Sequence, residues 1–209
     1  MLTDWEYRRQ IVTCGKQVYG QGLVAATDGN ISVRMLDDRM LITPTGAALG
    51  NLNPEELVYL DLTGTVLQGR LQPSSELALH LMIYHRRPDV LAVIHAHPPI
   101  ATAFSVAGEV LSRLVLPEVI VQFGEIPTAP YATPATTESA QAVQELIQHH
   151  DLIVLDHHGA VAVGESLTAA RQKMEKLEHT AKILLAADQL GTIRPLSATA
   201  ILALQQLKK

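Results

Sequence analysis

The chain has a single cysteine, Cys14, so no internal disulfide can form and any metal site has to use histidine, aspartate or glutamate ligands. A chain without disulfides fits a reducing compartment, and the first residues lack the apolar run of a signal peptide. We therefore expect a cytoplasmic protein. No stretch approaches the ~18 apolar residues that span a bilayer, so we expect no membrane partner.

Positive charge is also scarce. The sequence holds 16 Lys and Arg against 21 Asp and Glu, for a net charge of −5, and the basic residues do not cluster. Nucleic-acid binding requires clustered cations, so we expect no nucleic-acid partner. What the chain does contain is 47% hydrophobic residues over 209 positions, which is enough for one domain with a full core.

Apolar periodicity and turn residues predict alternating helices and strands. Helices are expected at residues 4–22, 73–89, 98–108, 136–150, 167–191 and 197–209, with Ser74 or Ser75 capping the second. Strands are expected within 27–35 and 40–50, as a hairpin at 57–69, and as buried strands at 90–97 and 151–157, while 119–136 is predicted as short strands and turns. The regular βαβ rhythm of a parallel sheet is missing. We predict an α+β, three-layer αβα sandwich with a mainly antiparallel central sheet and a single domain over 1–209.

Two histidines end one of the predicted buried strands, in "VIHAHPP" at residues 93–99. Alternate side chains of a strand point to the same face, so His95 and His97 project together and could bind one metal ion. His-x-His also arises by chance, and the pair alone is equally compatible with ordinary residues at a strand end.

A third histidine follows the other buried strand, in "LDHHG". His157 and His158 are adjacent, so only one of them can face a metal if the segment is extended. Gly159 permits an unusual backbone conformation or the close approach of another group. Three neutral imidazoles would form an open zinc site with a free position for substrate.

Three turns are rich in hydrogen-bond donors that could bind an anion. The segment "SSE", residues 74–76, precedes a predicted helix, where backbone N–H groups and hydroxyls favour negative charge. The turns "GNIS" at 29–32 and "TPTG" at 43–46 offer further N–H and hydroxyl groups. Each turn is a weak signal when taken alone.

The combination is more specific than its parts. The motifs "TDGNISVR", "LITPTG", "PSSE", "IHAH", "APYAT" and "HHG" have the order and spacing of the class II aldolase/adducin family, which includes L-fuculose-1-phosphate aldolases and L-ribulose-5-phosphate 4-epimerases. The chain resembles this family from about residue 5 to residue 190.

The resemblance implies a role for each matching residue. His95, His97 and His158, with Glu76, would hold one zinc ion or another divalent metal per subunit. Glu76 would also serve as the catalytic acid/base. The substrate phosphate would be held by Asn30, Thr45, Gly46, Ser74 and Ser75. The implied enzyme is a homotetramer with its sites between subunits, which cleaves a phosphorylated sugar to dihydroxyacetone phosphate and an aldehyde.

The reaction itself stays open. The fuculose-phosphate aldolases carry a catalytic tyrosine in the segment that matches residues 114–127, which here has no tyrosine but contains Glu118. Tyr131 belongs to the separate "PYAT" motif, and the tail has no tyrosine. Epimerisation, decarboxylation or dehydration of a sugar or sugar-acid phosphate could use the same zinc site. A non-catalytic, adducin-like interaction module would be expected to lose the metal ligands, which this chain retains.

Overall fold

The computed structural model describes residues 2–35, 38–111 and 114–207. Its centre is a mixed sheet of eight strands in the order β4-β3-β2-β1-β5-β8-β7-β6. All neighbouring pairs are antiparallel except β6 and β7, which are parallel. The strands are β1 (Asn30–Arg34), β2 (Arg39–Ile42), β3 (Val58–Asp61), β4 (Val66–Gln68), β5 (Ala92–Ala96), β6 (Thr128–Ala129), β7 (Leu152–Leu155) and β8 (Gly159–Gly164).

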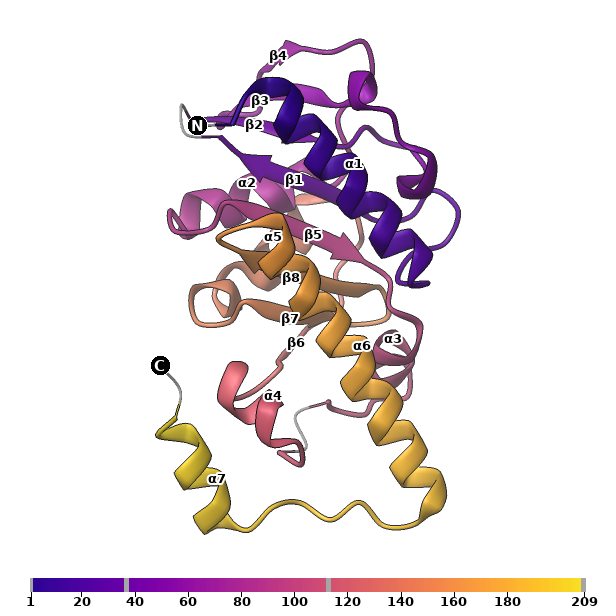
Figure 1. Cartoon of the computed structure of the whole chain (residues 1–209), viewed down its shortest axis with the longest axis vertical. Helices are drawn as coiled ribbons and strands as arrows, with labels where there is room; N and C mark the ends of the chain where they lie inside the picture. The colour runs from indigo at the N-terminus through magenta and orange to yellow at the C-terminus, as the bar shows by residue number, and fades with distance from the viewer. Residues whose placement is uncertain (1, 36–37, 112–113, 208–209) are drawn as a thin grey trace.

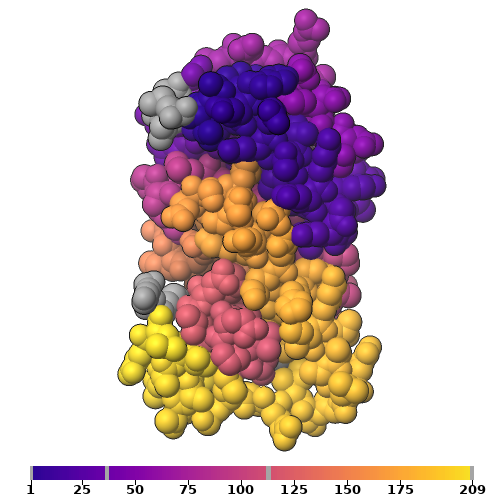
Figure 2. Space-filling model, viewed as in Figure 1, coloured from indigo at the N-terminus to yellow at the C-terminus, as the bar shows by residue number. Residues whose placement is uncertain are grey.

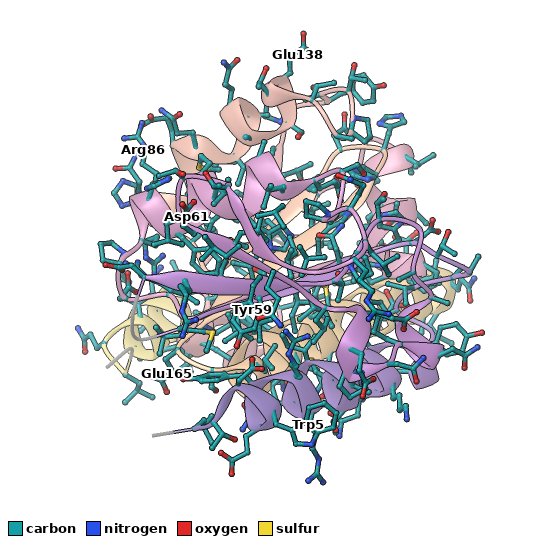
Figure 3. The ribbon with its side chains drawn as sticks, turned by 90° about the horizontal axis from the view of Figure 1, so that it is seen from above. Trp5, Tyr59, Asp61, Arg86, Glu138 and Glu165 are labelled. Carbon is teal, nitrogen blue, oxygen red and sulfur yellow. The ribbon has the colours of Figure 1, made fainter. Side chains whose placement is uncertain are left out.

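Helices cover both faces of the sheet (Figure 1). They are α1 (Asp4–Gly20), α2 (Leu77–Arg86), α3 (Pro99–Val106), α4 (Pro117–Gln122), α5 (Thr137–Gln144), α6 (Leu167–Leu190) and α7 (Ala198–Gln205). Short 3₁₀ turns lie at η1 (Leu49–Asn51), η2 (Pro54–Glu56) and η3 (Leu146–Gln148). The view from above in Figure 3 shows α1, with the exposed Trp5, on one side of the sheet and Glu138 of α5 on the other.

Two apolar clusters hold these helices on the sheet. One joins α1, α3 and α6 to side chains such as Ile31 and Ile94, and the other joins α2 and α5 to side chains such as Val93. The division follows from the strand period of two, which turns neighbouring residues of β5 to opposite faces. His95 therefore lies on the same face as Val93, toward α2.

The last helix stands apart from both layers. After α6 the chain runs along residues 191–197 to α7, which lies against α4 (Figure 1). Figure 2 shows α1, α6 and α7 on one surface of the molecule. Among the described residues, no helix combines the length and apolarity needed to cross a bilayer.

The structure confirms the mainly antiparallel sheet and most of the predicted elements. The predicted helix at 197–209 is α7, with residues 208 and 209 outside the described part. Two local predictions are wrong. Residues 117–122 form helix α4 instead of strands and turns, and α2 begins at Leu77 with Glu76, rather than Ser74 or Ser75, at its N-cap. The Ser74 hydroxyl instead accepts the Glu76 N–H at 3.2 Å. Strand β8 lies in a segment for which the sequence predicts no element.

Candidate metal centre and acid/base site

Three of the predicted histidines converge at one end of β5 and β8. The ring centroids of His95, His97 and His158 lie 4.7 to 4.8 Å from one another. One ring nitrogen from each falls in a group whose members are all within 4.8 Å. The Nε2 atoms of His95 and His97 are 3.0 Å apart. The His-x-His pair thus faces one point, and His158 rather than His157 completes the group.

The protonation of these rings suits metal binding. The Nδ1 atom of His95 lies 3.0 Å from the Ala160 carbonyl oxygen, to which it must donate, so its Nε2 is left without a proton. Burial, and then the neighbouring His97 and His158, hold the pKa of His95 well below its usual range. Burial likewise lowers the pKa of His158. Neutral imidazoles with converging lone pairs are the form that binds a divalent cation.

Glu76 brings a carboxylate to the same point. Its Oε2 lies 3.0 Å from His95 Nε2, and its Oε1 lies 3.8 Å from His158 Nε2. Glu76 is buried, and Oε1 has no hydrogen-bond partner within the described chain. A buried carboxylate oxygen without a partner is costly in free energy, and a cation among the three imidazoles would offset that cost. The residues present therefore fit a divalent metal.

The turn that presents His158 is shaped by its neighbours. His157 takes the left-handed backbone conformation, with φ of 56°, and its N–H donates to the Ser105 hydroxyl of α3 at 3.1 Å. A Cβ at Gly159 would lie 2.4 Å from the Ala96 carbonyl oxygen and 2.8 Å from His97 Cδ2. The predicted close approach at Gly159 is confirmed, whereas the unusual backbone conformation belongs to His157.

The residues predicted to bind phosphate lie on two adjoining segments and on β1. The Thr45 N–H donates to the Gln72 carbonyl at 3.1 Å, and the Ser74 N–H donates to the Thr43 carbonyl at 3.1 Å. These bonds place the turn with exposed Thr45 and Gly46 beside the segment with buried Ser74 and exposed Ser75. Anion binding by these residues stays a prediction.

Asn30 lies opposite His95 in the register of β1 and β5. Its side-chain amide nitrogen donates to Glu76 Oε2 at 2.8 Å. The second hydrogen of that nitrogen is left for the predicted contact with phosphate.

The sequence indicates no role in the site for Ser32, Tyr84 or Ser105. His80 lies one helical turn after Glu76 and could orient it, although packing in the core or around the site is the interpretation that the sequence favours. His80 contacts Asn30, and Ser32 joins His80 to Tyr84. Ser105 contacts the backbone of His157. Each of these contacts spans 48 to 52 residues of sequence, so no local motif marks them. Glu118, the candidate for the missing tyrosine, lies exposed in the first turn of α4.

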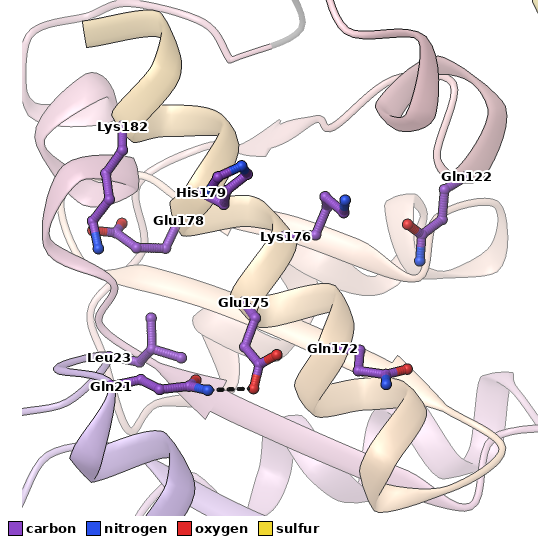
Figure 4. Close-up of a pocket in the computed structure, with 9 residues that line it drawn as sticks. All are labelled: Gln21, Leu23, Gln122, Gln172, Glu175, Lys176, Glu178, His179 and Lys182. Carbon is purple, nitrogen blue, oxygen red and sulfur yellow. Dashed lines mark hydrogen bonds and ion pairs between the residues drawn. The ribbon is translucent and has the colours of Figure 1, made fainter. Parts of the chain in front are cut away.

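A hollow of about 610 Å³ lies elsewhere, along α6 and the end of α1 (Figure 4). Its two glutamates already have structural partners. Glu175 accepts from Gln21 at 2.6 Å, and buried Glu178 accepts the N–H groups of Ile100 and Ala101 at the start of α3. None of the three histidines lines this hollow, so we do not assign the reaction to it.

The fold and the convergent histidines beside a buried carboxylate define a metal-dependent enzyme. Residues 9–185 match the pattern of the Class II Aldolase and Adducin N-terminal domain, and the chain belongs to this family. The resemblance stated from the sequence is thereby confirmed, as is the expectation of an enzyme of the class II, lyase type.

Two curated relatives differ in activity. The chain is 35% identical over 181 residues to 3-oxo-tetronate 4-phosphate decarboxylase of Escherichia coli K12, covering 85% of each chain. It is 38% identical over 166 residues to L-fuculose phosphate aldolase of Methanococcus vannielii, covering 79% of this chain and 88% of the relative. Among solved structures, YgbL of Escherichia coli, described as an aldolase, epimerase or decarboxylase, matches with a TM-score of 0.89 and 34% identity over 97% of this chain and 99% of YgbL.

Proposed function

We propose that this chain is a divalent-metal lyase which decarboxylates a four-carbon 3-oxo sugar-acid 4-phosphate, such as 3-oxo-tetronate 4-phosphate. Loss of the carboxyl carbon from that substrate leaves dihydroxyacetone phosphate. The observation that carries the proposal is the free Oε1 of Glu76, the single carboxylate oxygen without a partner beside the histidines in the described chain.

The reaction requires one proton at one carbon. As CO₂ leaves, the electron pair of the broken C–C bond passes into the carbonyl to give an enediolate. A bound metal, held by His95, His97 and His158, would supply Lewis acidity that favours this negative charge. Glu76 Oε1 then delivers a proton from solvent to the carbon that lost CO₂. Asn30 holds the other oxygen of Glu76 in place.

The sites for substrate and metal follow the same proposal. The phosphate would lie at Ser74, Ser75, Thr45, Gly46 and Asn30, away from the bond that breaks, and would orient it. The side chains of His97 and His158 are 26% and 15% exposed, so substrate could reach a metal held by these residues.

We also propose that zinc is the metal, that residues 1–209 form one domain in the cytoplasm, and that the enzyme is a homotetramer with sites between subunits. Light scattering that gave a monomer would contradict the last point.

A second candidate function is aldol cleavage of an L-fuculose-1-phosphate-like ketose phosphate. The relative from Methanococcus vannielii favours it. Aldol cleavage gives the same enediolate but also removes a proton from a hydroxyl group beyond the broken bond. Residues 114–127 have no tyrosine for that step, and Glu118 would have to supply the base. Decarboxylation needs no such group, and this favours it.

A product assay separates the two functions. Zinc-loaded enzyme is given 3-oxo-tetronate 4-phosphate, L-fuculose 1-phosphate and L-ribulose 5-phosphate, and dihydroxyacetone phosphate, CO₂ and aldehyde are measured separately. Dihydroxyacetone phosphate with equimolar CO₂ from the first substrate is the expected result. If L-fuculose 1-phosphate yields aldehyde while 3-oxo-tetronate 4-phosphate yields no CO₂, the enzyme is an aldolase and the second candidate function replaces the first. Glu76→Gln should lower kcat by about 10²- to 10⁴-fold, whereas Glu118→Gln should not.

A further inference from the structure

A chain of buried polar side chains runs from the site carboxylate to the interior between the sheet and α2. Asn30 Nδ2 lies 2.8 Å from Glu76 Oε2, and His80 Nε2 lies 2.5 Å from Asn30 Oδ1. Ser32 Oγ lies 2.6 Å from His80 Nδ1 and 2.8 Å from the Tyr84 hydroxyl. Asn30 and Glu76 are at most 7% exposed, and Ser32, His80 and Tyr84 at most 1%.

The donor in each of these bonds follows from the chemistry of the groups. The carboxylate accepts, so the amide nitrogen of Asn30 faces it and the amide oxygen faces His80. That oxygen needs a donor, so the proton of His80 is on Nε2 and its Nδ1 accepts from the Ser32 hydroxyl. The Ser32 oxygen then accepts from Tyr84. Every bond is directed toward Glu76 Oε2, and aligned hydrogen bonds strengthen one another.

The protonation states agree with this order. Burial lowers the pKa of His80 to about 3, so its ring is neutral with a single proton. Burial also raises the pKa of Tyr84 well above its usual value, so its hydroxyl keeps the proton that it donates.

Packing of α2 on the sheet does not require this chain of polar groups. Leu79 and Ile83 of the same helix pack against the sheet through apolar contact alone, and buried polar groups are costly unless each finds a partner. The chain ends on Oε2 of Glu76 and leaves Oε1 without a partner. The arrangement therefore determines which oxygen of the carboxylate Asn30 holds, namely Oε2, and which is left without a hydrogen bond beside His158, namely Oε1.

We propose that His80, Ser32 and Tyr84 are positioning residues, which fix the orientation of the Asn30 amide and, through it, the Glu76 carboxylate with Oε1 free for proton transfer. This inference rests on the proposed role of Glu76. Without the His80 N–H, the Asn30 amide can turn over and place its oxygen against Oε2. The carboxylate would then lose its support and the orientation required for proton transfer.

The test compares His80→Leu with His80→Gln, which keeps an N–H donor close to the position of Nε2. His80→Leu should lower kcat about 10- to 100-fold, as loss of a supporting hydrogen bond does at metal sites, with KM changed less than about threefold. His80→Gln should recover most of that loss. In a Glu76→Gln background, His80→Leu should have no further effect on kcat, because it acts through that carboxylate.

Two milder variants keep the inference testable if His80→Leu does not fold. Ser32→Ala should lower kcat more than Tyr84→Phe, because Ser32 contacts His80 directly. Ser139→Ala is the matched control, since it also removes a buried serine hydroxyl, on α5, and should leave kcat unchanged. Equal kcat in Ser32→Ala and Ser139→Ala would overturn the inference, as would equal kcat in His80→Leu and His80→Gln.

A measurement that does not depend on enzyme activity tests the chain of hydrogen bonds directly. The ¹⁵N NMR spectrum of metal-free protein should show His80 with its proton on Nε2, and a proton on Nδ1 would overturn the inference whatever the kinetics. The proposed function fails in a different way, with Glu76→Gln as active as the unmodified enzyme while the NMR spectrum still shows the Nε2–H form.

Discussion

The hydroxyl of Ser105 accepts the backbone N–H of His157 at 3.1 Å, across 52 residues of sequence. This bond ties α3 to the turn in which His157 has a φ of 56° and after which His158 faces the other two histidines. Ser105 also donates to the Thr102 carbonyl at 2.9 Å, so its hydroxyl proton is directed away from His157 and its oxygen accepts the His157 N–H. Helix α3, which carries none of the three histidines, thus helps to position the third one.

Ser105→Ala should weaken metal binding about 10-fold, in the range seen when a supporting hydrogen bond at a metal site is removed. The measurement is competition with a chromogenic chelator for zinc. Ser139→Ala is a matched control, because Ser139 donates to the carbonyl three residues earlier in the same way as Ser105 but holds no turn. If both variants bind zinc as the unmodified protein does, Ser105 does not position His158.

The adjacent histidines give a second prediction. His158→Ala should lower zinc affinity by more than about 100-fold, beyond the effect of a supporting residue, because it removes a ligand. His157→Asn should leave zinc affinity close to that of the unmodified protein, since asparagine tolerates the left-handed backbone conformation found there. Metal content after dialysis measures both. Greater loss of zinc from His157→Asn would reverse the assignment of the third ligand.

The two serines before α2 should differ in their effects. Ser75 is exposed, whereas the buried Ser74 hydroxyl accepts the Glu76 N–H. Ser75→Ala should raise KM for a phosphorylated substrate about 10-fold, the loss expected for one hydrogen bond to a charged group, without changing Tm. Ser74→Ala should raise KM and also lower Tm. An unchanged KM in Ser75→Ala, measured by steady-state kinetics, would remove it from the phosphate site.

Acid should destabilise the metal-free protein through its buried histidine. His80 has a folded-state pKa of about 3, against an ordinary value of 6.5. Between these values the unfolded chain binds a proton that the folded protein does not, so stability falls as pH falls below about 6.5. The free energy of unfolding should drop by roughly 1.4 kcal/mol per pH unit from this residue.

Urea unfolding of the metal-free protein between pH 7.5 and pH 5 tests that slope. In His80→Leu the free energy of unfolding should fall less steeply with pH, by the same roughly 1.4 kcal/mol per pH unit, than in the unmodified protein. The variant should nevertheless be less stable than the unmodified protein at pH 7.5. His179→Leu is the control, because His179 is exposed on α6. An identical pH dependence in His80→Leu and the unmodified protein would show that His80 is protonated alike in both states.

The site could be predicted from the sequence where its chemistry lies in short motifs. The shared direction of His95 and His97 follows from the period of a strand, whereas His158 and Glu76 were indicated by the resemblance of "HHG" and "PSSE" to motifs of the family. His80, Ser32 and Ser105 could not be assigned in the same way. Their partners lie 48 to 52 residues away in sequence, and serine and histidine on a helix or strand usually have no such role.

The fold shows the same limit at two elements. The β-branched residues of "PEVIVQ" favour a strand, yet α4 forms because Pro117 and Glu118 suit a helix start and Val119 and Ile120 become buried. The small residues of "GAVAVG" gave no prediction of an element, yet they pair with β5 on one side and β7 on the other to form β8. In both cases contacts distant in sequence decide the local structure.

The pairing of Asn30 with His95 in the central ladder also bears on how the protein folds. A slip of one residue between β1 and β5 would turn the side chains of β1 to the opposite face and bring Ile31 to the place of Asn30. Such a slipped chain would keep many backbone bonds but would lose the support of Glu76. A cation that binds only the intact site stabilises the correctly paired sheet by mass action. Zinc uptake during refolding should therefore count the molecules whose strands have aligned correctly.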